Sequence, residues 1–208
     1  MHRISRAGLA LALMLVASPA LASEPGEDRG LDLSLHYGLD KYDAVGLKSG
    51  LGGLSRSSLL DGTSTTIGAT AIYRSGMAEL GAIGEIGRPG STGGTTLLGL
   101  LGGFGFNVAG IRLEALGELG AHKYGDVLHD AEVVSRSRAE AWLVSLGIRP
   151  GLSMRFGPQG ALLFGVWAFA RWDLTSQDVQ VNLSSGGSSS YKLGGSQFGA
   201  AIRVGVSL

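Results

Sequence analysis

Apolar and polar residues alternate along eight stretches of the chain between residues 31 and 208. Side chains that alternate with a period of two point to opposite faces of a β-strand. The fifth stretch is the clearest example, because Ile111, Leu113 and Leu119 share one parity while Arg112 and Glu118 share the other. We therefore predict eight strands, at about residues 31–39, 64–74, 77–87, 95–107, 111–122, 139–156, 161–174 and 197–208.

Two of these stretches are less regular. Leu97-Leu98-Gly99-Leu100-Leu101 has no polar face and resembles a buried helix segment, but four glycines between residues 99 and 105 disfavour a helix interior. We predict a strand in which Leu98, Leu100, Phe104 and Phe106 share a face. Pro150 has no N–H to donate to a strand ladder, so we expect a bulge or a break there.

The connections between the stretches alternate in length. Short turns rich in Gly, Asn or Pro lie at 74–76, 107–110 and 157–160, whereas longer segments lie at 40–63, 88–94, 123–138 and 175–191. Short turns on one side and long loops on the other are typical of barrels in bacterial outer membranes. The pattern predicts an all-β fold, an eight-stranded antiparallel up-and-down transmembrane β-barrel with short periplasmic turns and longer extracellular loops.

The N-terminal residues 1–22 have the features of an export signal peptide. Arg3 and Arg6 precede a short apolar run, and Ala20-Leu21-Ala22 provides small residues for cleavage. The run is too short for a membrane-spanning helix, which needs about 20 apolar residues. We therefore predict a signal peptide at 1–22, a barrel domain at 23–208, and a location in the outer membrane.

Composition excludes several classes of protein. The chain has no cysteine, which excludes disulfides, lipoprotein acylation and thiolate metal sites. Without residues 1–22 it would keep 15 of its 17 Lys and Arg residues against 17 Asp and Glu, so a nucleic-acid partner is not expected.

The charged face is predicted to line the barrel interior. Its bases are all Arg, whereas the lysines fall in or beside predicted loops, and an enclosed space favours guanidinium groups that pair with carboxylates. Inward glycines such as Gly165 would make room, so we expect a plugged, polar interior. A soluble lipocalin-like barrel with an apolar ligand is the alternative. The predicted charge network consists of Asp32, Glu79, Glu85, Arg112, Glu114, Glu118, Arg149, Arg155, Arg171, Asp173 and Arg203, and Arg74 lies on the same face.

The last strand alternates regularly, with the apolar residues Phe198, Ala200, Ile202, Val204, Val206 and Leu208 on one parity. This segment is similar to the assembly signal of small eight-stranded outer-membrane barrels of the OmpA/OmpX type, and residues 30–208 resemble that class in architecture. The class usually ends in Phe or Trp, whereas this chain ends in Leu208. The resemblance implies a monomer whose partners are outer-membrane lipid, lipopolysaccharide and the barrel-assembly machinery, with Phe198, Ile202, Val204, Val206 and Leu208 as the assembly signal.

Catalysis has little support in the sequence. Lipid A deacylases of the PagL type carry His-x-Ser, and palmitoyltransferases of this architecture carry Asp-Ser; neither motif occurs here. A polar group in the third long connection could form a metal or hydrolytic site, but its spacing matches no known ligand set, and a solvated loop is the simpler interpretation. This group consists of His122, Asp126, His129, Asp130, Glu132, Ser135 and Ser137.

We therefore predict no enzymatic activity, cofactor or metal, and a structural or surface-interaction role through the extracellular loops. A lipid A- or phospholipid-modifying enzyme is the alternative function. We also expect Tyr37 and Trp142 at the interfacial aromatic girdles.

Overall fold

The computed structural model describes residues 29–43, 62–89, 94–125, 133–137, 141–183 and 188–208. No helix in these ranges is long and apolar enough to span a membrane. The elements are β1 (Arg29–Asp43), β2 (Gly62–Ser75), β3 (Ala78–Pro89), β4 (Gly94–Val108), β5 (Ile111–Gly125), β6 (Val133–Ser137), β7 (Ala141–Phe156), the 3-10 turn η3 (Pro158–Gly160), β8 (Leu162–Asp173), β9 (Gln177–Leu183), β10 (Ser188–Leu193) and β11 (Ser196–Ser207).

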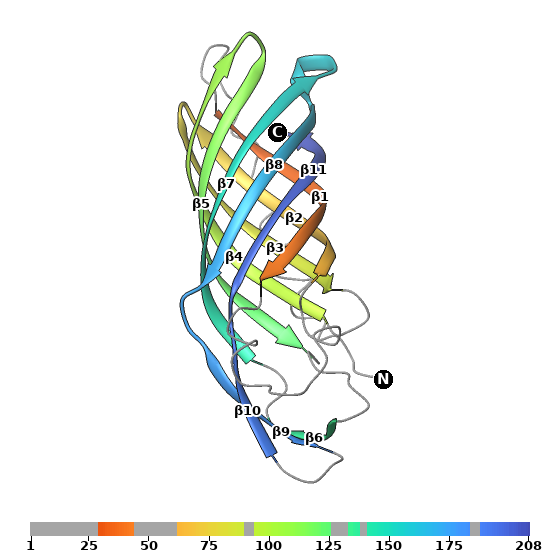
Figure 1. Ribbon diagram of the computed structural model, residues 1–208. Helices are drawn as coiled ribbons and strands as arrows, with labels where there is room; N and C mark the ends of the chain where they lie inside the picture. The colour runs from red at the N-terminus through yellow and green to blue at the C-terminus, as the bar shows by residue number, and fades with distance from the viewer. Residues whose placement is uncertain (1–28, 44–61, 90–93, 126–132, 138–140, 184–187) are drawn as a thin grey trace.

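Eight of the strands form a closed barrel in the order β1-β11-β8-β7-β5-β4-β3-β2, shown in Figure 1. Each strand pairs antiparallel with its neighbours, and β1 closes the barrel by pairing with β11. The barrel has an up-and-down topology, in which each barrel strand lies next to the following one in the chain. Two connections contain additional strands: β6 lies between β5 and β7, and β9 and β10 lie between β8 and β11. The predicted all-β, eight-stranded barrel is therefore confirmed, and each predicted stretch corresponds to one barrel strand.

The strands are strongly staggered around the barrel. The register leads from Asp32 through Ile72, Gly81, Leu101, Glu118, Gly147, Arg171 and Gln197 back to Tyr42 on the first strand, ten residues further along. A stagger of this size in eight strands corresponds to a tilt of roughly 40° from the barrel axis. Eight tilted strands enclose a space that side chains can fill.

The two ends of the barrel differ. At one end, called the turn end below, β2–β3 and β4–β5 are joined by the two-residue turns Gly76-Met77 and Ala109-Gly110. Ala109 and Gly110 have φ angles of 51° and 83°, the positive values that suit the twist of a tight hairpin. At this end Leu31 and Leu208 exchange two backbone hydrogen bonds of 2.9 Å. At the opposite end, the loop end, lie the strand ends that the longer connections join: β1 to β2, β3 to β4, β5 to β7 and β8 to β11.

Pro150 leaves β7 continuous. The pairing with β8 passes from Ile148–Ala170 to Gly151–Trp167 without a change of register, skipping two residues of β7. On the other side, Pro150 stays in register with Ala115 of β5. The expected bulge is thus wrong, and the break is confined to the ladder with β8, where the missing N–H leaves the register unchanged.

Beyond the loop end, β6, β9 and β10 form a second, three-stranded sheet with β9 in the centre. Figure 1 shows β9 and β10 extending away from the barrel from the ends of β8 and β11. The predicted connections at 123–138 and 175–191 are therefore partly strands that pair with each other. Ser135 and Ser137 lie on β6 in this sheet, opposite Asn182 and Gln180 of β9.

Candidate functional site

The interior of the barrel holds the predicted charge network. Carboxylates or guanidiniums on the inward parity are buried on every barrel strand except β4, which has no charged residue, and Arg149 and Arg203 are 0% and 1% exposed. Arg155 is the most accessible arginine of this network, with a side chain 25% exposed. Inward glycines supply the room, as predicted: a Cβ at Gly165 would lie 2.8 Å from Arg203 Nε. Apart from Asp173, which pairs with His122, the network falls into two groups along the barrel.

The turn-end group contains three carboxylates and four arginines. Arg74 Nε lies 2.9 Å from Asp32 Oδ2, and Arg155 Nη2 approaches the same oxygen at 3.2 Å. Arg112 Nε donates to Glu79 Oε1 at 2.6 Å. Glu114 accepts hydrogen bonds from Arg203, Ser153 and Trp167, the last over 3.1 Å to the indole nitrogen. The members are Asp32, Arg74, Glu79, Arg112, Glu114, Arg155 and Arg203.

The loop-end group is more tightly interconnected. Arg171 lies between Glu85 and Glu118, with nitrogen–oxygen distances of 2.6 and 2.5 Å. Arg149 joins the same two carboxylates at 2.7 and 2.6 Å. His36 Nε2 lies 2.9 Å from Glu85 Oε1. Gln197 connects Arg171 to Asp40, which completes the group: His36, Asp40, Glu85, Glu118, Arg149, Arg171 and Gln197.

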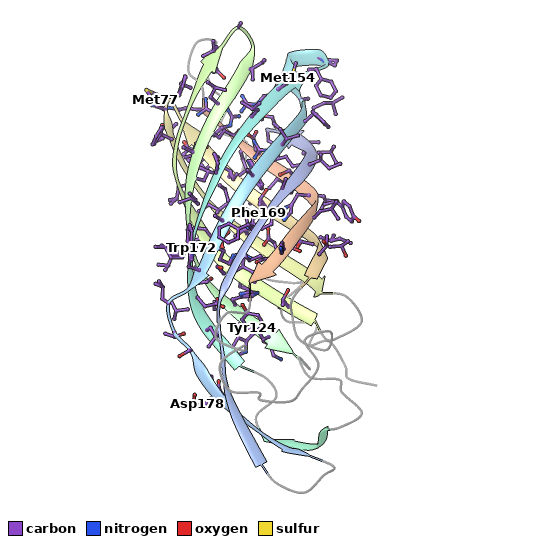
Figure 2. The ribbon with its side chains drawn as sticks, in the orientation of Figure 1. Met77, Tyr124, Met154, Phe169, Trp172 and Asp178 are labelled. Atoms are coloured by element: carbon purple, nitrogen blue, oxygen red, sulfur yellow. The ribbon has the colours of Figure 1, made fainter. Side chains whose placement is uncertain are left out.

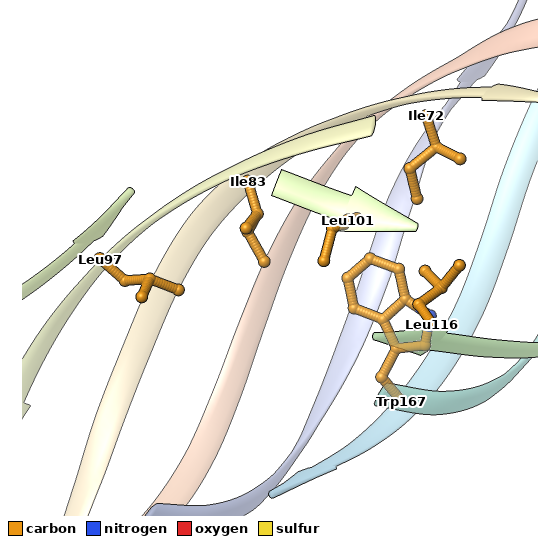
Figure 3. Packing of buried hydrophobic residues seen from close by; sticks show 6 residues of the cluster. All are labelled: Ile72, Ile83, Leu97, Leu101, Leu116 and Trp167. Atoms are coloured by element: carbon orange, nitrogen blue, oxygen red, sulfur yellow. The ribbon is translucent and has the colours of Figure 1, made fainter. Parts of the chain in front are cut away.

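An apolar cluster lies inside the barrel as well. It consists of Ile72, Ile83, Leu97, Leu101, Leu116 and Trp167, all at most 4% exposed (Figure 3). The guanidinium carbon of Arg203 lies 4.4 Å from the Trp167 ring centroid, and that of Arg149 lies 5.7 Å from it. Trp167 thus contacts one arginine of each group. A Cβ at Gly151 would lie 2.1 Å from Trp167 Cδ1, so only glycine accommodates the indole there.

Sequence reasoning missed part of this interior. It assigned a purely polar lining, whereas Leu97 and Leu101 point inward and Leu98 and Leu100 outward, as expected for a strand apolar on both faces. It also placed Asp40 in a loop, although β1 continues to Asp43 and Asp40 is 3% exposed inside the barrel. The parity of Asp32, Ser34 and His36 extends to Asp40 and was the available signal.

The predicted polar group near the loop end is only partly described. His122 is buried, and its Nδ1 lies 3.2 Å from Asp173 Oδ1. Tyr124 donates its hydroxyl to Asp173 Oδ2 at 2.5 Å, and the Gly195 N–H donates to the same oxygen. Asp126, His129, Asp130 and Glu132 lie outside the described residues. Within the described part of the chain, no three His, Cys, Asp or Glu side chains are grouped as metal ligands.

The outer face of the barrel is apolar. Leucine, isoleucine, valine and aromatic side chains on the outward parity are about half exposed, for example Leu100 at 65% and Ile202 at 52%. On β8 these positions run over ten residues from Leu162 to Trp172, which is about 33 Å along the strand. A tilt of roughly 40° reduces this to about 25 Å along the axis, the height of the apolar band of an outer-membrane barrel.

Outward aromatic side chains gather toward both ends of this band. Toward the loop end lie Trp142, Trp172 and Phe198, the latter two edge to face with centroids 6.0 Å apart. Tyr37 is also outward but lies six residues before the end of β1. Figure 2 shows Trp172 on this side and Met77 and Met154 at the turn end. The aromatic residues toward the turn end are Tyr73, Phe104, Phe106, Phe156 and Phe164.

The predicted assembly-signal residues all lie on this outer face. Phe198, Ile202, Val204 and Val206 are 41–53% exposed, and Leu208 is 69% exposed. Their backbone is fixed by the ladders to β1 and β8. Their side chains are therefore presented outward while the strand itself is fully paired.

Comparison with known proteins supports the fold. The chain is similar to the crystal structure of Neisserial surface protein A (NspA), with 12% identity, a TM-score of 0.50, and coverage of 84% of this chain and 96% of that one. It also matches the translocator domain of autotransporter NalP from Neisseria meningitidis, with 12% identity and a TM-score of 0.28, over 96% of this chain and 95% of that domain. No family model and no curated protein matches the sequence.

Proposed function

We propose that this protein is an integral outer-membrane barrel that is closed to solutes and presents its three-stranded sheet at the cell surface for interaction with a partner. The observation that carries this proposal is the combination of an apolar outer wall with a filled, ion-paired interior. A wall of this height and composition matches a lipid bilayer. The turn end then faces the periplasm and the loop end faces outward.

The same observation disfavours a soluble lipocalin-like barrel. Such a protein turns its charged side chains toward water and keeps an apolar cavity for its ligand. Here the charges of β3, β5, β7 and β8 point inward, and Trp167, Arg149 and Leu101 fill the space a ligand would need. An exposed apolar surface of this extent would be unstable in water. The outer membrane, reached through the signal peptide predicted at 1–22, is the environment that satisfies this surface.

The sheet of β6, β9 and β10 supports the surface-interaction role. It extends beyond the barrel, and β9 pairs with both other strands. β6 and β10 are the outer strands of this sheet, and an edge strand offers backbone groups to which a partner strand or loop can pair. We propose that the partner of this sheet is lipopolysaccharide, a protein or another cell surface. We also propose that the barrel is a monomer.

The location is tested first by fractionation and by gel mobility in SDS with and without boiling. A closed barrel in the outer-membrane fraction resists SDS unboiled and changes mobility on boiling. Recovery in the soluble periplasmic fraction without such a shift would overturn the membrane location.

The sheet is tested by Val181→Pro, because Val181 is paired with Ser189 on one side and Arg136 on the other. Proline removes an N–H from this central strand. Val181→Thr keeps the N–H and is the matched control. We expect Val181→Pro to abolish adhesion to lipopolysaccharide-coated surfaces or to host cells while the barrel keeps its heat-dependent mobility. Unchanged adhesion in that variant would contradict a role for the sheet.

A further inference from the structure

The two ionic groups inside the barrel differ in their charge balance. The turn-end group has the three carboxylates of Asp32, Glu79 and Glu114 and four arginines. The loop-end group has three carboxylates, from Asp40, Glu85 and Glu118, but only the two arginines Arg149 and Arg171. His36 Nε2 lies 2.9 Å from Glu85 Oε1 in the same group. The arginines alone therefore leave the loop-end group one positive charge short, whereas the turn-end group has one in excess.

Asp40 is the carboxylate of the loop-end group that has no arginine. Its Oδ2 accepts hydrogen bonds from the Thr66 hydroxyl, at 2.7 Å, and from the side-chain amide of Gln197. Among the described residues no cation is paired with it. Its Oδ1 is buried and has no hydrogen-bond partner. The other carboxylates of the two groups each have an arginine nitrogen within 3.2 Å, whereas Asp40 has none.

The surroundings of Asp40 provide further oxygen atoms. Ser64 lies directly opposite Asp40 in the β1–β2 ladder and is 1% exposed. Its hydroxyl makes only a long contact of 3.5 Å to the Thr65 carbonyl, so it is available to another partner. The Thr66 hydroxyl is already at Asp40. On the other side of β1, a Cβ at Gly199 would lie 2.5 Å from Phe169 Cζ and 2.8 Å from the Asp40 Cβ, so any residue larger than glycine would crowd both side chains.

A buried carboxylate requires a compensating charge, and a carboxylate surrounded by hydroxyl oxygens provides ligands of the type that hard metal cations prefer. We propose that Asp40, with the hydroxyls of Ser64 and Thr66, binds one hard metal cation such as Ca²⁺ inside the loop end of the barrel. One carboxylate among neutral oxygens gives a weak site, with a dissociation constant on the order of 10⁻³ M. The site is independent of the partner proposed for the three-stranded sheet.

The test uses the full-length protein, purified in detergent in a metal-free buffer with choline as its only added cation. Binding of ⁴⁵Ca²⁺ and the thermal unfolding midpoint are measured as CaCl₂ is added against choline chloride at equal ionic strength. We expect saturable binding at one site and a rise in the midpoint, because a ligand of the native state stabilises it. In Asp40→Asn, which keeps the shape of the side chain, affinity should fall at least tenfold. Ser64→Ala should weaken binding less.

Asp173→Asn is the matched control. Asp173 is also a carboxylate at the loop end, but His122, Tyr124 and the Gly195 N–H, rather than an arginine, lie at its oxygens. The Asp173→Asn variant should bind Ca²⁺ with the same affinity as the wild type. Heat-dependent gel mobility establishes that each variant is folded. Absence of saturable binding, equal binding in Asp40→Asn, or equal losses in Asp40→Asn and Asp173→Asn would each overturn the proposal, the last by indicating general attraction to negative charge.

Discussion

Arg203 lies over the indole ring of Trp167 inside the barrel, with its guanidinium carbon 4.4 Å from the ring centroid. The two side chains also share Glu114, which accepts a hydrogen bond from each. A cation over an aromatic face is attracted by the ring quadrupole, and the attraction is larger where water is excluded. This contact joins the turn-end ionic group to the apolar cluster, of which Trp167 is a member.

Trp167→Ala should be strongly destabilising. It removes a side chain that is 1% exposed, leaves a cavity and deprives Glu114 of a hydrogen-bond donor. Truncation of a buried tryptophan costs about 3–5 kcal/mol of the free energy of unfolding. Urea unfolding in lipid vesicles measures this cost. Trp172→Ala, on the outer face at 40% exposure, is the control and should cost clearly less. Equal costs would contradict the packing described here.

The buried ion pairs should be sensitive to the loss of one partner. Arg171→Leu leaves Glu85 and Glu118 each without one of their two arginines and removes a donor to Gln197. Breaking a buried pair in this way costs about 3–5 kcal/mol. Arg155→Leu removes a longer pair at a side chain that is 25% exposed, so its effect should be smaller. The comparison is made by urea unfolding of both variants in the same vesicles.

The barrel should not conduct ions. Its interior contains two ion-paired groups and an apolar cluster that includes Trp167 and Leu101. Reconstitution in planar bilayers should give no stable channel current for the wild type. A Trp167→Gly and Leu101→Gly double variant, if it retains heat-dependent mobility, should show current because the middle of the interior is emptied. Open channels in the wild type would contradict a filled interior.

Leu208 should affect assembly rather than stability. Its backbone is fixed by two hydrogen bonds to Leu31, whereas its side chain is 69% exposed. We expect Leu208→Phe to speed, and Leu208→Asp to slow, the appearance of the heat-modifiable form after pulse labelling in cells. Val108→Asp changes another exposed apolar residue at the turn end and serves as the control for added charge. Identical kinetics in the three Leu208 forms would show that Leu208 is not part of an assembly signal.

A lipid-modifying activity is not expected. His122 and Asp173 form a hydrogen-bonded pair, but both side chains are at most 2% exposed, so a lipid substrate does not reach them in this conformation. Mass spectrometry of lipid A from cells that express the wild type and from cells that express His122→Ala should give the same species. A modified lipid A species that disappears with His122→Ala would instead establish the enzymatic alternative.

Sequence alternation predicted the strands because a strand with one apolar and one charged face shows a period of two in its residues. Arg112, Glu114 and Glu118 on β5 needed no other information. The prediction was incomplete where that pattern is lost. Leu97 and Leu101 have no polar neighbours to mark their face, so the interior apolar cluster was not foreseen.

Pairing between distant loops leaves no comparable local signal. β6 and β9 are separated by the whole of β7 and β8, and their ladder contains an irregularity between Val133 and Ser135. Short polar strands of this kind have no alternation strong enough to set a register. The three-stranded sheet could therefore be found only in the structure.

The ion pairs of the interior mostly join strands that are not neighbours. Arg203 of β11 reaches Glu114 of β5, and Arg171 of β8 reaches Glu85 of β3 on the far side of the barrel. An incomplete or open sheet would bring these charges into the bilayer without their partners, at a cost of several kcal/mol for each. These interior charges are therefore paired with one another only when the barrel is closed. Because the pairing of these charges depends on strands that meet only in the closed barrel, we expect an open or partly formed barrel to be less stable in a bilayer than the closed one.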